Sequence, residues 1–427
     1  MNICMMTNTY LPHVGGVARS VHSFTEKYRQ RGHDTLVVAP TFPEARHGEP
    51  GVVRLPAIQN FNGSDFSVRL PIPGFLSDEI EGFQPSLVHS HHPFLVGDTA
   101  VRIARQWETP LVFTHHTLYE RYTHYVPFDS SVMRDLAISL PTSYANLCSL
   151  VIAPSESISR LLKKRGVETP VEVVPTGVDV DFFQRGDRNR AREKYDIAPD
   201  RFVVGHVGRL AFEKNLEFLT RSVAEAIKES ENAVFLVVGE GKARKKMEKI
   251  FADCRLDQRI IFTGKLSGEA LADAYRAMDL FAFASTSETQ GMVIAEAMAA
   301  SLPVVALDGP GVREVVEDRT NGRLVHAEAD AHAFATVIRE LIDRPREELD
   351  QTAAAALDTA RKFDQDVCVD KMLGLYERLL TENARGPRPQ VHEAWRRIMK
   401  GIAAEWELVT QKANTISASI SEEDKEV

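Results

Sequence analysis

Short runs of apolar residues recur along the chain and alternate with longer stretches of helical period. Most runs are apolar nearly throughout, which is typical of parallel strands that are covered on both faces of a sheet. The pattern occurs twice, and it predicts an α/β fold with two Rossmann-like, doubly wound parallel sheets that face each other across a cleft. The expected strands are 2–6, 34–39, 52–55, 86–89, 110–114, 150–153 and 171–174 in the first half, and 202–207, 233–238, 259–263, 280–284, 303–306 and 322–325 in the second.

The length of the chain fits this duplication, because 427 residues are too many for one compact core. A polar, charge-rich segment without a strand pattern separates the two series of strands, and a second shift in composition follows Arg385, where Gly and Pro interrupt a helix. We therefore expect an N-terminal domain at 1–180, a linker at 181–200, a C-terminal domain at 201–385, and a helical extension with a polar tail at 386–427.

Charge and cysteine content restrict the class of protein. The net charge of −9, from 51 Lys and Arg against 60 Asp and Glu, argues against a nucleic-acid partner. The first residues show no secretory signal, and no stretch approaches the ~20 apolar residues of a membrane-spanning helix. The four cysteines lie far apart and form no CxxC pair, as is usual in a reducing compartment. We expect a cytoplasmic protein.

Ligand sites in open α/β sheets lie at the carboxyl ends of the strands. After the first strand, Gly15, Gly16 and Val17 open a helix, and such a glycine pair lets the backbone approach an anion closely. A simple tight turn is the alternative interpretation. The first strand of the second half is followed by Gly208, Arg209 and Lys214, and the two cations are suited to a diphosphate, although Lys214 alone could be a solvated surface charge.

The most informative segment follows strand 280–284. Glu288 lies in a loop, and residues 289–300 predict a helix with Gly291 in its first turn. The N–H groups of Gln290, Gly291 and Met292 would then form a diphosphate site. Glu296, further along the same helix, could reach a pair of sugar hydroxyls, and its apolar neighbours imply that its charge needs a partner. The alternative is that the two carboxylates are unrelated surface acids.

Histidines gather after two neighbouring strands of the first half, at His89, His91, His92, His115 and His116. Their spacing matches no common zinc motif, so we expect no metal site. A histidine at a cleft can orient a substrate hydroxyl or carry a proton near neutral pH. For any one of them, a supporting hydrogen-bonded role is the alternative.

Five motifs, taken together, resemble one family. Glu288 and Glu296 have seven residues between them, and four further segments agree in order and spacing: 15–17, 114–117, 175–179, and Gly208–Arg209 with Lys214. The chain resembles, over about residues 1–380, the retaining group-one (family four) nucleotide-sugar glycosyltransferases, which have the GT-B fold.

The resemblance implies a role for each matching residue. Glu288 would contact the donor sugar and Glu296 the ribose of the nucleotide. Arg209 and Lys214 would neutralise the departing diphosphate, which the backbone of 290–292 and of Gly16 would cradle. His116 would approach the donor sugar or the acceptor. The N-terminal domain would bind the acceptor and the C-terminal domain the nucleotide-sugar donor, expected to be UDP-glucose or a related UDP-hexose. Neither a cofactor nor a metal is implied, and anomeric configuration is retained.

The acceptor is suggested by the segment that follows His116. Its residues Tyr119, Tyr122, His124 and Tyr125 resemble the bacterial diacylglycerol glucosyltransferase branch, with sulfolipid-forming transferases nearby. We therefore expect a membrane-lipid hydroxyl as acceptor. The alternatives are the same chemistry on a soluble or polysaccharide-precursor acceptor and, more remotely, a non-catalytic nucleotide-sugar binding protein or an epimerase of similar shape.

Contact with an anionic membrane surface has separate sequence support. Basic residues cluster at 160–165 and 242–249, and the segment 392–410 places aromatic and aliphatic residues at helical spacing beside basic ones. We expect peripheral association with the inner face of the cytoplasmic membrane. The same apolar stripe could instead pack on the protein or in a dimer, and the oligomeric state is left open.

Overall fold

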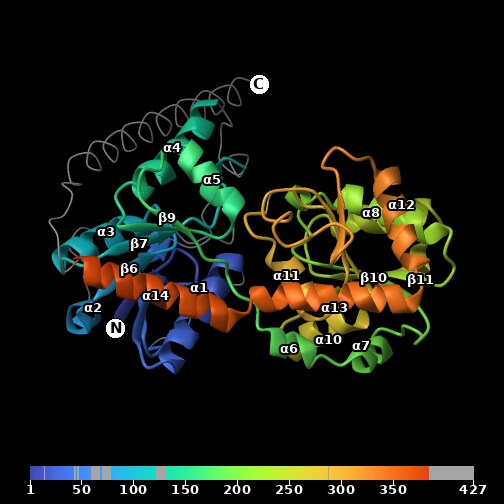
Figure 1. The fold of residues 1–427 in the computed structure, drawn as a ribbon, viewed down its shortest axis with the longest axis horizontal. Coiled ribbons are helices and arrows are strands. Elements are labelled where there is room, and N and C mark those ends of the chain that lie inside the picture. Colours follow the sequence, from blue (N-terminus) through green and yellow to red (C-terminus); the bar gives the residue numbers. More distant parts are fainter. Residues whose placement is uncertain are drawn as a thin grey trace, which may run out of the picture.

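The structure is a computed structural model, and the two halves of the chain form two lobes that lie side by side (Figure 1). Each lobe contains its own parallel sheet with helices on both faces. The residues described are 1–13, 15–42, 45, 48–58, 68–69, 78–121, 131–286 and 288–383.

The first lobe is built on a seven-stranded parallel sheet with the order β3-β2-β1-β6-β7-β8-β9. A small antiparallel pair, β4 (Ala57–Ile58) with β5 (Val68–Arg69), forms a separate sheet of its own. The strands of the large sheet are β1 (Asn2–Met6), β2 (Asp34–Pro40), β3 (Val52–Leu55), β6 (Leu87–Ser90), β7 (Leu111–Thr114), β8 (Leu150–Ala153) and β9 (Val171–Val173). Its helices are α1 (Gly16–Gln30), α2 (Asp78–Phe83), α3 (Val96–Gln106), α4 (Ser131–Ala145) and α5 (Glu156–Lys164).

The second lobe repeats this plan with a six-stranded parallel sheet in the order β12-β11-β10-β13-β14-β15. Its strands are β10 (Phe202–Val207), β11 (Ala233–Val238), β12 (Ile260–Gly264), β13 (Leu280–Phe283), β14 (Val304–Leu307) and β15 (Gly322–Val325). Its helices are α6 (Val180–Gln184), α7 (Arg188–Lys194), α8 (Leu216–Lys228), α9 (Arg244–Asp253), α10 (Glu269–Ala277), α11 (Met292–Ala299), α12 (Ala331–Ile342) and α13 (Arg346–Lys362).

The apolar strands are buried on both faces, as the sequence predicts. In β1, Ile3 and Met5 join one hydrophobic cluster, while Cys4 and Met6 join another on the opposite face of the sheet. Successive side chains of a strand point to opposite faces, so a strand between two helical layers must be apolar at every position. All thirteen expected strands are present, with bounds that shift by one residue at most.

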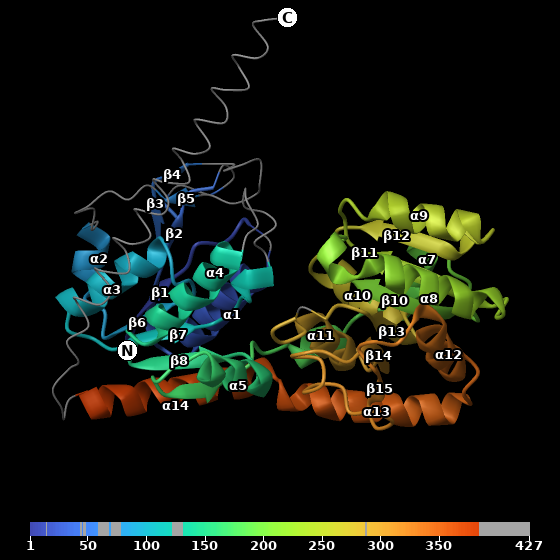
Figure 2. The ribbon, with the colours of Figure 1, turned by 90° about the horizontal axis from the view of Figure 1, so that it is seen from above.

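The chain crosses between the lobes a second time near its C-terminus. Helix α13 lies on the second lobe, and α14 (Gln365–Asn383) continues nearly end to end with it onto the first (Figure 2). Val369, Met372 and Tyr376 of α14 join the first-lobe core beside α1. This position differs from the prediction that residues 201–385 form one domain, because the apolar face of α14 is buried against the first sheet.

The expected linker at 181–200 is partly helical and packs on the second lobe. It contributes α7 and most of α6, and both helices contact α10. Phe183, Ala191 and Ile197 are buried in the second-lobe core. These apolar side chains, spaced among charged residues, place the segment within that lobe.

None of the helices in the described part of the chain has the length and apolar character that a membrane span requires. Cys4, Cys148 and Cys368 are buried, Cys254 is partly buried, and none of the four is in a disulfide. The extension expected at 386–427 lies outside the described residues.

Candidate active site

The polar motifs found in the sequence gather where the strand order of each sheet reverses. In the first sheet this point lies between β1 and β6, and in the second between β10 and β13. Loops that leave the carboxyl ends of two such strands diverge, which leaves a crevice for a ligand. The loop after β10 carries Arg209 and Lys214, and the loop after β13 carries Glu288.

Lys214 and Glu288 form an ion pair across these two loops. The Nζ atom of Lys214 lies 2.5 Å from Oε1 of Glu288, and the same oxygen accepts a hydrogen bond of 2.8 Å from Ser285 Oγ. Both charged side chains are about one-fifth exposed. An ammonium group has three donors, so Lys214 can hold Glu288 and a ligand oxygen at the same time.

Arg209 stands at the edge of the same crevice. Its side chain is 61% exposed, and its guanidinium donates to Glu213 over 2.6 Å. Gly208, next to it, packs against Gly239, where a Cβ atom would lie 1.9 Å from the Gly208 carbonyl oxygen. Gly241 approaches the Leu210 carbonyl in the same way. The segment 239–241 therefore fixes the loop that carries Arg209.

The helix after Glu288 begins later than the sequence predicts. Its first helical residue is Met292, and Gly291 is the N-cap with a φ of +70°, a left-handed conformation that favours glycine. The prediction that Gly291 lies in the first turn is therefore wrong. The amide of the buried Gln290 side chain donates to the carbonyl oxygen of Thr176 and accepts from its N–H, at 2.6 and 2.8 Å. Gln290 thus joins the loop to the interlobe connection.

Glu296 is buried on α11 and has partners from both lobes. Tyr275 donates a hydrogen bond of 2.7 Å to one carboxylate oxygen, and Arg19 of α1 approaches the other at 3.3 Å. Burial raises the pKa of Glu296, while Arg19 and Tyr275 act in the opposite direction. The sequence predicted that this carboxylate needs a partner, but neither partner could be found from local patterns, because both are far away along the chain.

A cavity of about 400 Å³ opens between the lobes beside Glu296. Met292 and Glu296 line it from the second lobe, and Arg19 and His22 of α1 line it from the first. The volume lies within the range of ligand pockets for small molecules.

The glycine pair stands at the start of α1, as expected. Gly15 is the N-cap, Gly16 is the first helical residue, and Val17 packs at the edge of the first-lobe core. A Cβ atom on Gly16 would meet no atom within 4 Å, so the backbone is open to approach at this point. Arg19 lies one turn further along and reaches Glu296, so this end of α1 faces the second lobe.

His116 is half-buried at the carboxyl end of β7 and is paired with another histidine. Its Nε2 lies 2.9 Å from Nδ1 of His91, and the two rings are stacked. Burial lowers the pKa of His116 to about 4, so the imidazole is neutral near pH 7. One ring nitrogen therefore donates in this contact and the other accepts.

The other histidines of this edge are neutral near pH 7; His89 and His115 are buried, and His92 is partly buried. Burial lowers the pKa of His89, His92 and His115 to about 3. His89 lies 2.5 Å from the Tyr376 hydroxyl of α14 and 2.7 Å from Thr114 Oγ1. These contacts support the first lobe, whereas His116 lies closer to the second.

The two lobes meet directly beside these residues. Ser155 donates to the Thr289 carbonyl oxygen at 2.7 Å, and the Thr289 hydroxyl donates to the His116 carbonyl oxygen at 3.0 Å. The Glu314 carboxylate accepts hydrogen bonds from two backbone N–H groups, those of Glu156 and Ser157, at the start of α5. These contacts bring His116 next to the loop that carries Glu288.

The tyrosines expected to bind the acceptor are described only in part. Tyr119 lies in a short 3-10 turn, with its ring edge-on to those of Phe94 and His115. Burial raises the pKa of its hydroxyl. Tyr122, His124 and Tyr125 lie outside the described residues. Among the residues that are described, no three His, Cys, Asp or Glu side chains are grouped so that they could hold a metal ion.

Comparison with known proteins decides the family. Residues 187–358 match the glycosyl transferases of group 1, and residues 14–182 match glycosyltransferase family 4. A D-inositol 3-phosphate glycosyltransferase of Xylanimonas cellulosilytica is 31% identical over 302 residues, which are 68% of this chain and 71% of that protein. The chain belongs to the group 1 glycosyltransferases. An alpha-monoglucosyldiacylglycerol synthase of Streptococcus pneumoniae is 28% identical over 353 residues, 81% of this chain and 79% of the relative.

The architecture of this glycosyltransferase is also shared with solved structures. The crystal structure of Anabaena HepE in complex with UDP has a TM-score of 0.70 and 22% identity, and the match covers 88% of this chain and 100% of that one. The predicted GT-B fold is thereby confirmed. The resemblance to the glycolipid-synthase branch is likewise supported by the pneumococcal relative.

Proposed function

We propose that this glycosyltransferase moves a hexose, with retention of configuration, from UDP-glucose or a related UDP-hexose to a hydroxyl of a membrane lipid such as diacylglycerol. The observation that carries the proposal is the pairing of Lys214 with Glu288, beside Arg209, at the point where the second sheet reverses its strand order. The pneumococcal relative is named for glucosyl transfer to a diacylglycerol, and the Anabaena structure contains UDP.

The cations of the second lobe supply the electrostatic part of the reaction. A diphosphate leaving group gains negative charge as its bond to the sugar breaks, and donors that are already in place stabilise that charge at little reorganisation cost. Arg209 and Lys214 provide the full charges, and the start of α11 provides backbone N–H groups. The leaving phosphate oxygen then takes the proton of the acceptor hydroxyl, which makes metal or cofactor chemistry unnecessary.

The two carboxylates hold the two ends of the donor in this proposal. Glu288 accepts hydrogen bonds from hydroxyl groups of the sugar, and Lys214 and Ser285 orient its carboxylate. Glu296 borders the interlobe cavity and accepts hydrogen bonds from the ribose hydroxyl groups. Holding both ends of the donor fixes the anomeric carbon relative to the acceptor, which is a large part of catalysis between two substrates.

His116 is the residue of the first lobe that we place nearest to the reacting sugar. Its ring is neutral and its tautomer is linked to that of His91. It therefore contributes a hydrogen bond to a hydroxyl rather than a full charge.

A second acceptor class is favoured by one relative. The Xylanimonas relative is named for D-inositol 3-phosphate, and its similarity supports a water-soluble acceptor with the same donor chemistry. A screen of donors against acceptors, with product mass as the readout, separates the two. We expect transfer from UDP-glucose to diacylglycerol in mixed micelles, with full activity in the presence of a chelator. Transfer to soluble acceptors alone would contradict the lipid assignment, and loss of activity with chelator would contradict metal independence.

Glu288→Gln tests the catalytic assignment directly. The side-chain amide of the variant has no charge to hold Lys214, and it cannot accept hydrogen bonds from two sugar hydroxyls. We therefore expect kcat to fall about 100-fold or more. Thermal unfolding and UDP binding are expected to stay close to wild type. Glu248→Gln, which alters a surface ion pair with Arg244 on α9, is the matched control and should keep full activity. Near-normal turnover in Glu288→Gln would show that the residue has another role.

A further inference from the structure

A second polar pocket lies at the opposite edge of the second sheet from the candidate active site. Asp279 immediately precedes β13, whereas Glu288 follows the same strand. The pocket beside Asp279 has a volume of about 120 Å³, and it is bordered by the residues after α11 and by one face of α13. It is therefore separate from the donor and acceptor cleft.

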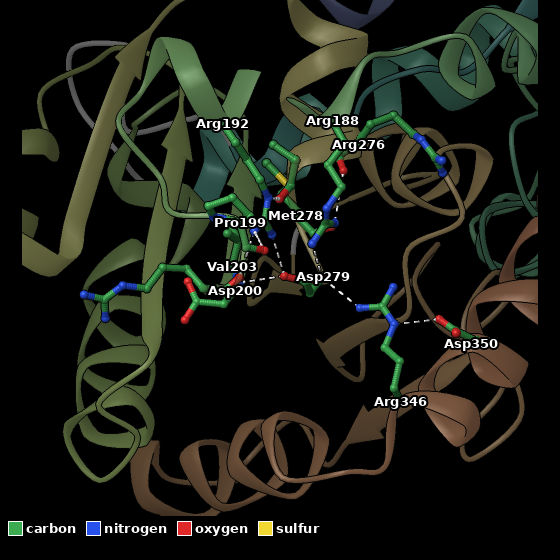
Figure 3. Close-up of polar contacts among 12 residues, drawn as sticks. Arg188, Arg192, Pro199, Asp200, Val203, Arg276, Met278, Asp279, Arg346 and Asp350 are labelled. Carbon is green, nitrogen blue, oxygen red and sulfur yellow. Dashed lines mark hydrogen bonds and ion pairs between the residues drawn. The ribbon is translucent and has the colours of Figure 1, made fainter. Parts of the chain in front are cut away.

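Three arginines converge on the Asp279 carboxylate at the base of this pocket (Figure 3). Arg188 and Arg346 donate to one oxygen at 2.8 and 3.1 Å, and Arg192 donates to the other at 2.8 Å. The backbone N–H of Val203 donates to that second oxygen as well. The carboxylate is 3% exposed, so these bonds compensate for its burial.

The positive charge of these three arginines exceeds the single negative charge of Asp279. A fourth, Arg276, also lines the pocket, and its buried Nε has no hydrogen-bond partner among the described residues. Asp350 is the one further carboxylate on the pocket wall, and it pairs with Arg346 at 2.9 Å. Burial lowers the pKa of Arg276, and the charge of Arg188 lowers it further. The pocket thus carries unbalanced positive charge.

A purely structural role explains part of the cluster but not all of it. Arg192 is 3% exposed and donates to four backbone carbonyl oxygens besides Asp279, as expected of a structural residue. Arg346, in contrast, is 66% exposed and reaches Asp279 from the rim of the pocket. Because most of this side chain is exposed, an anion that enters the pocket from solvent can reach it.

We propose that this pocket binds a phosphate group, either inorganic phosphate or the phosphate of a small monoester. Guanidinium groups bind phosphate oxygens as planar forks, and Arg188, Arg276 and Arg346 border one small space. The volume is about ten times the ~10–15 Å³ that a single water requires, which is enough for a tetrahedral oxyanion. The bound anion would balance the positive charge of the arginines that Asp279 and Asp350 do not neutralise.

The test is thermal unfolding of the full chain during titration with phosphate, with chloride holding the ionic strength constant. We expect a saturable rise in melting temperature for the wild type. Arg346→Gln should weaken the apparent affinity roughly 10- to 100-fold, since one charged hydrogen-bonding group is lost. The matched control is Arg361→Gln, also on α13, 63% exposed and paired with Asp358. It should leave the phosphate response unchanged.

Two further arms make the assignment specific. Lys214→Gln removes a cation of the donor site, and the saturable response should survive it if phosphate binds at Asp279. Asp350→Asn removes the competing carboxylate beside Arg346 and should strengthen phosphate binding several-fold. Glycerol phosphate, used in place of inorganic phosphate, tests whether a monoester is accepted, and a saturable response to either compound supports the proposal. A rise that does not saturate, or one that is equal in Arg346→Gln, would overturn it.

Discussion

Histidines with strongly lowered pKa values gather at one edge of the first lobe. His89, His92 and His115 have their pKa values lowered to about 3 by burial, far below the ordinary value of 6.5. In the unfolded chain they take up protons near pH 6.5, while in the folded chain they stay neutral until about pH 3. Stability is therefore lost as the pH falls through this window, because the unfolded state binds more protons.

His115 offers a clean measurement of this effect. Neither of its ring nitrogens has a hydrogen-bond partner among the described residues, although the ring is buried. We expect His115→Leu to be as stable as wild type at pH 7.5. Between pH 6 and pH 4, its free energy of unfolding should decline less steeply, by up to about 1.4 kcal/mol per pH unit. Urea unfolding at several pH values provides the measurement.

The exposed His332 is the control for this series. It lies on the surface of α12 beside Glu225, and 69% of its side chain is exposed. His332→Gln should keep the acid sensitivity of the wild type. An unchanged slope in His115→Leu would mean that His115 does not contribute to the acid loss of stability.

Individual site residues could be predicted from the sequence where the signal is local. The positions of Glu288, Glu296, Arg209 and Lys214 after their strands follow from strand pattern and spacing, and the structure places them at the expected sheet edge. Their partners could not be predicted. Tyr275 and Arg19 contact Glu296 because α10 and α1 pack beside α11. A short window of sequence does not reveal such packing between distant segments.

At the scale of elements, strands were easier to predict than helix ends. Strand positions follow from continuous apolar runs, which require burial on both faces. The start of α11 is three residues later than predicted, because Gly291 takes a left-handed conformation that periodicity does not reveal. Helix boundaries depend on such single-residue conformations, and a sequence pattern marks them only loosely.

A residue of the other lobe adds to the N-terminal cap that Ser155 provides for helix α5. The Glu314 carboxylate accepts from the N–H groups of Glu156 and Ser157, where the helix dipole favours negative charge. We expect Glu314→Ala to loosen the contact between the lobes and to raise the KM for the donor several-fold, with a smaller effect on kcat. Small-angle X-ray scattering should show a larger radius of gyration than in the wild type.

Glu317→Ala is the matched control for this clamp. Glu317 lies three residues further on and is exposed, so its removal leaves the start of α5 intact. It should preserve both the scattering curve and the KM. Wild-type scattering and kinetics in Glu314→Ala would show that the lobes are held together by the Thr289 and Gln290 contacts instead.

At the scale of the whole molecule, the proposed lipid acceptor implies contact with a membrane surface. The residues 392–410 place apolar side chains at helical spacing beside basic ones, which predicts a helix that lies on an anionic surface. We expect deletion of 386–427 to reduce binding to vesicles that contain anionic lipid, and to affect neutral vesicles little. Vesicle co-sedimentation is the measurement.

The basic face of α5 provides a second arm of this experiment. Lys163 and Lys164 are exposed in its last turn, as the basic run in the sequence suggested. Lys163→Glu with Lys164→Glu should lower vesicle binding further in the deleted chain. Full binding by the deletion variant, together with a change in its oligomeric state by light scattering, would assign 386–427 to protein packing.

The two-lobe plan could be predicted because each half repeats the same strand–helix alternation. The return of the chain to the first lobe at α14 could not be predicted, because the pattern of α14 is that of an amphipathic helix that could pack on either lobe. Its burial against α1 is decided by contacts such as that between Tyr376 and Tyr28, which are 348 positions apart and whose hydroxyls lie 3.2 Å from each other. Contacts at that separation arise from tertiary packing alone.

The position of α14 has a consequence for synthesis on the ribosome. The first lobe is translated first, yet its core lacks Val369, Met372 and Tyr376 until almost the whole described chain has emerged. At roughly 5–20 residues per second, the interval between the end of β9 and the end of α14 is on the order of ten to forty seconds. During that time the apolar face of α1 and the ring of His89 lack their contacts with α14. The lobe that is made first is therefore completed last.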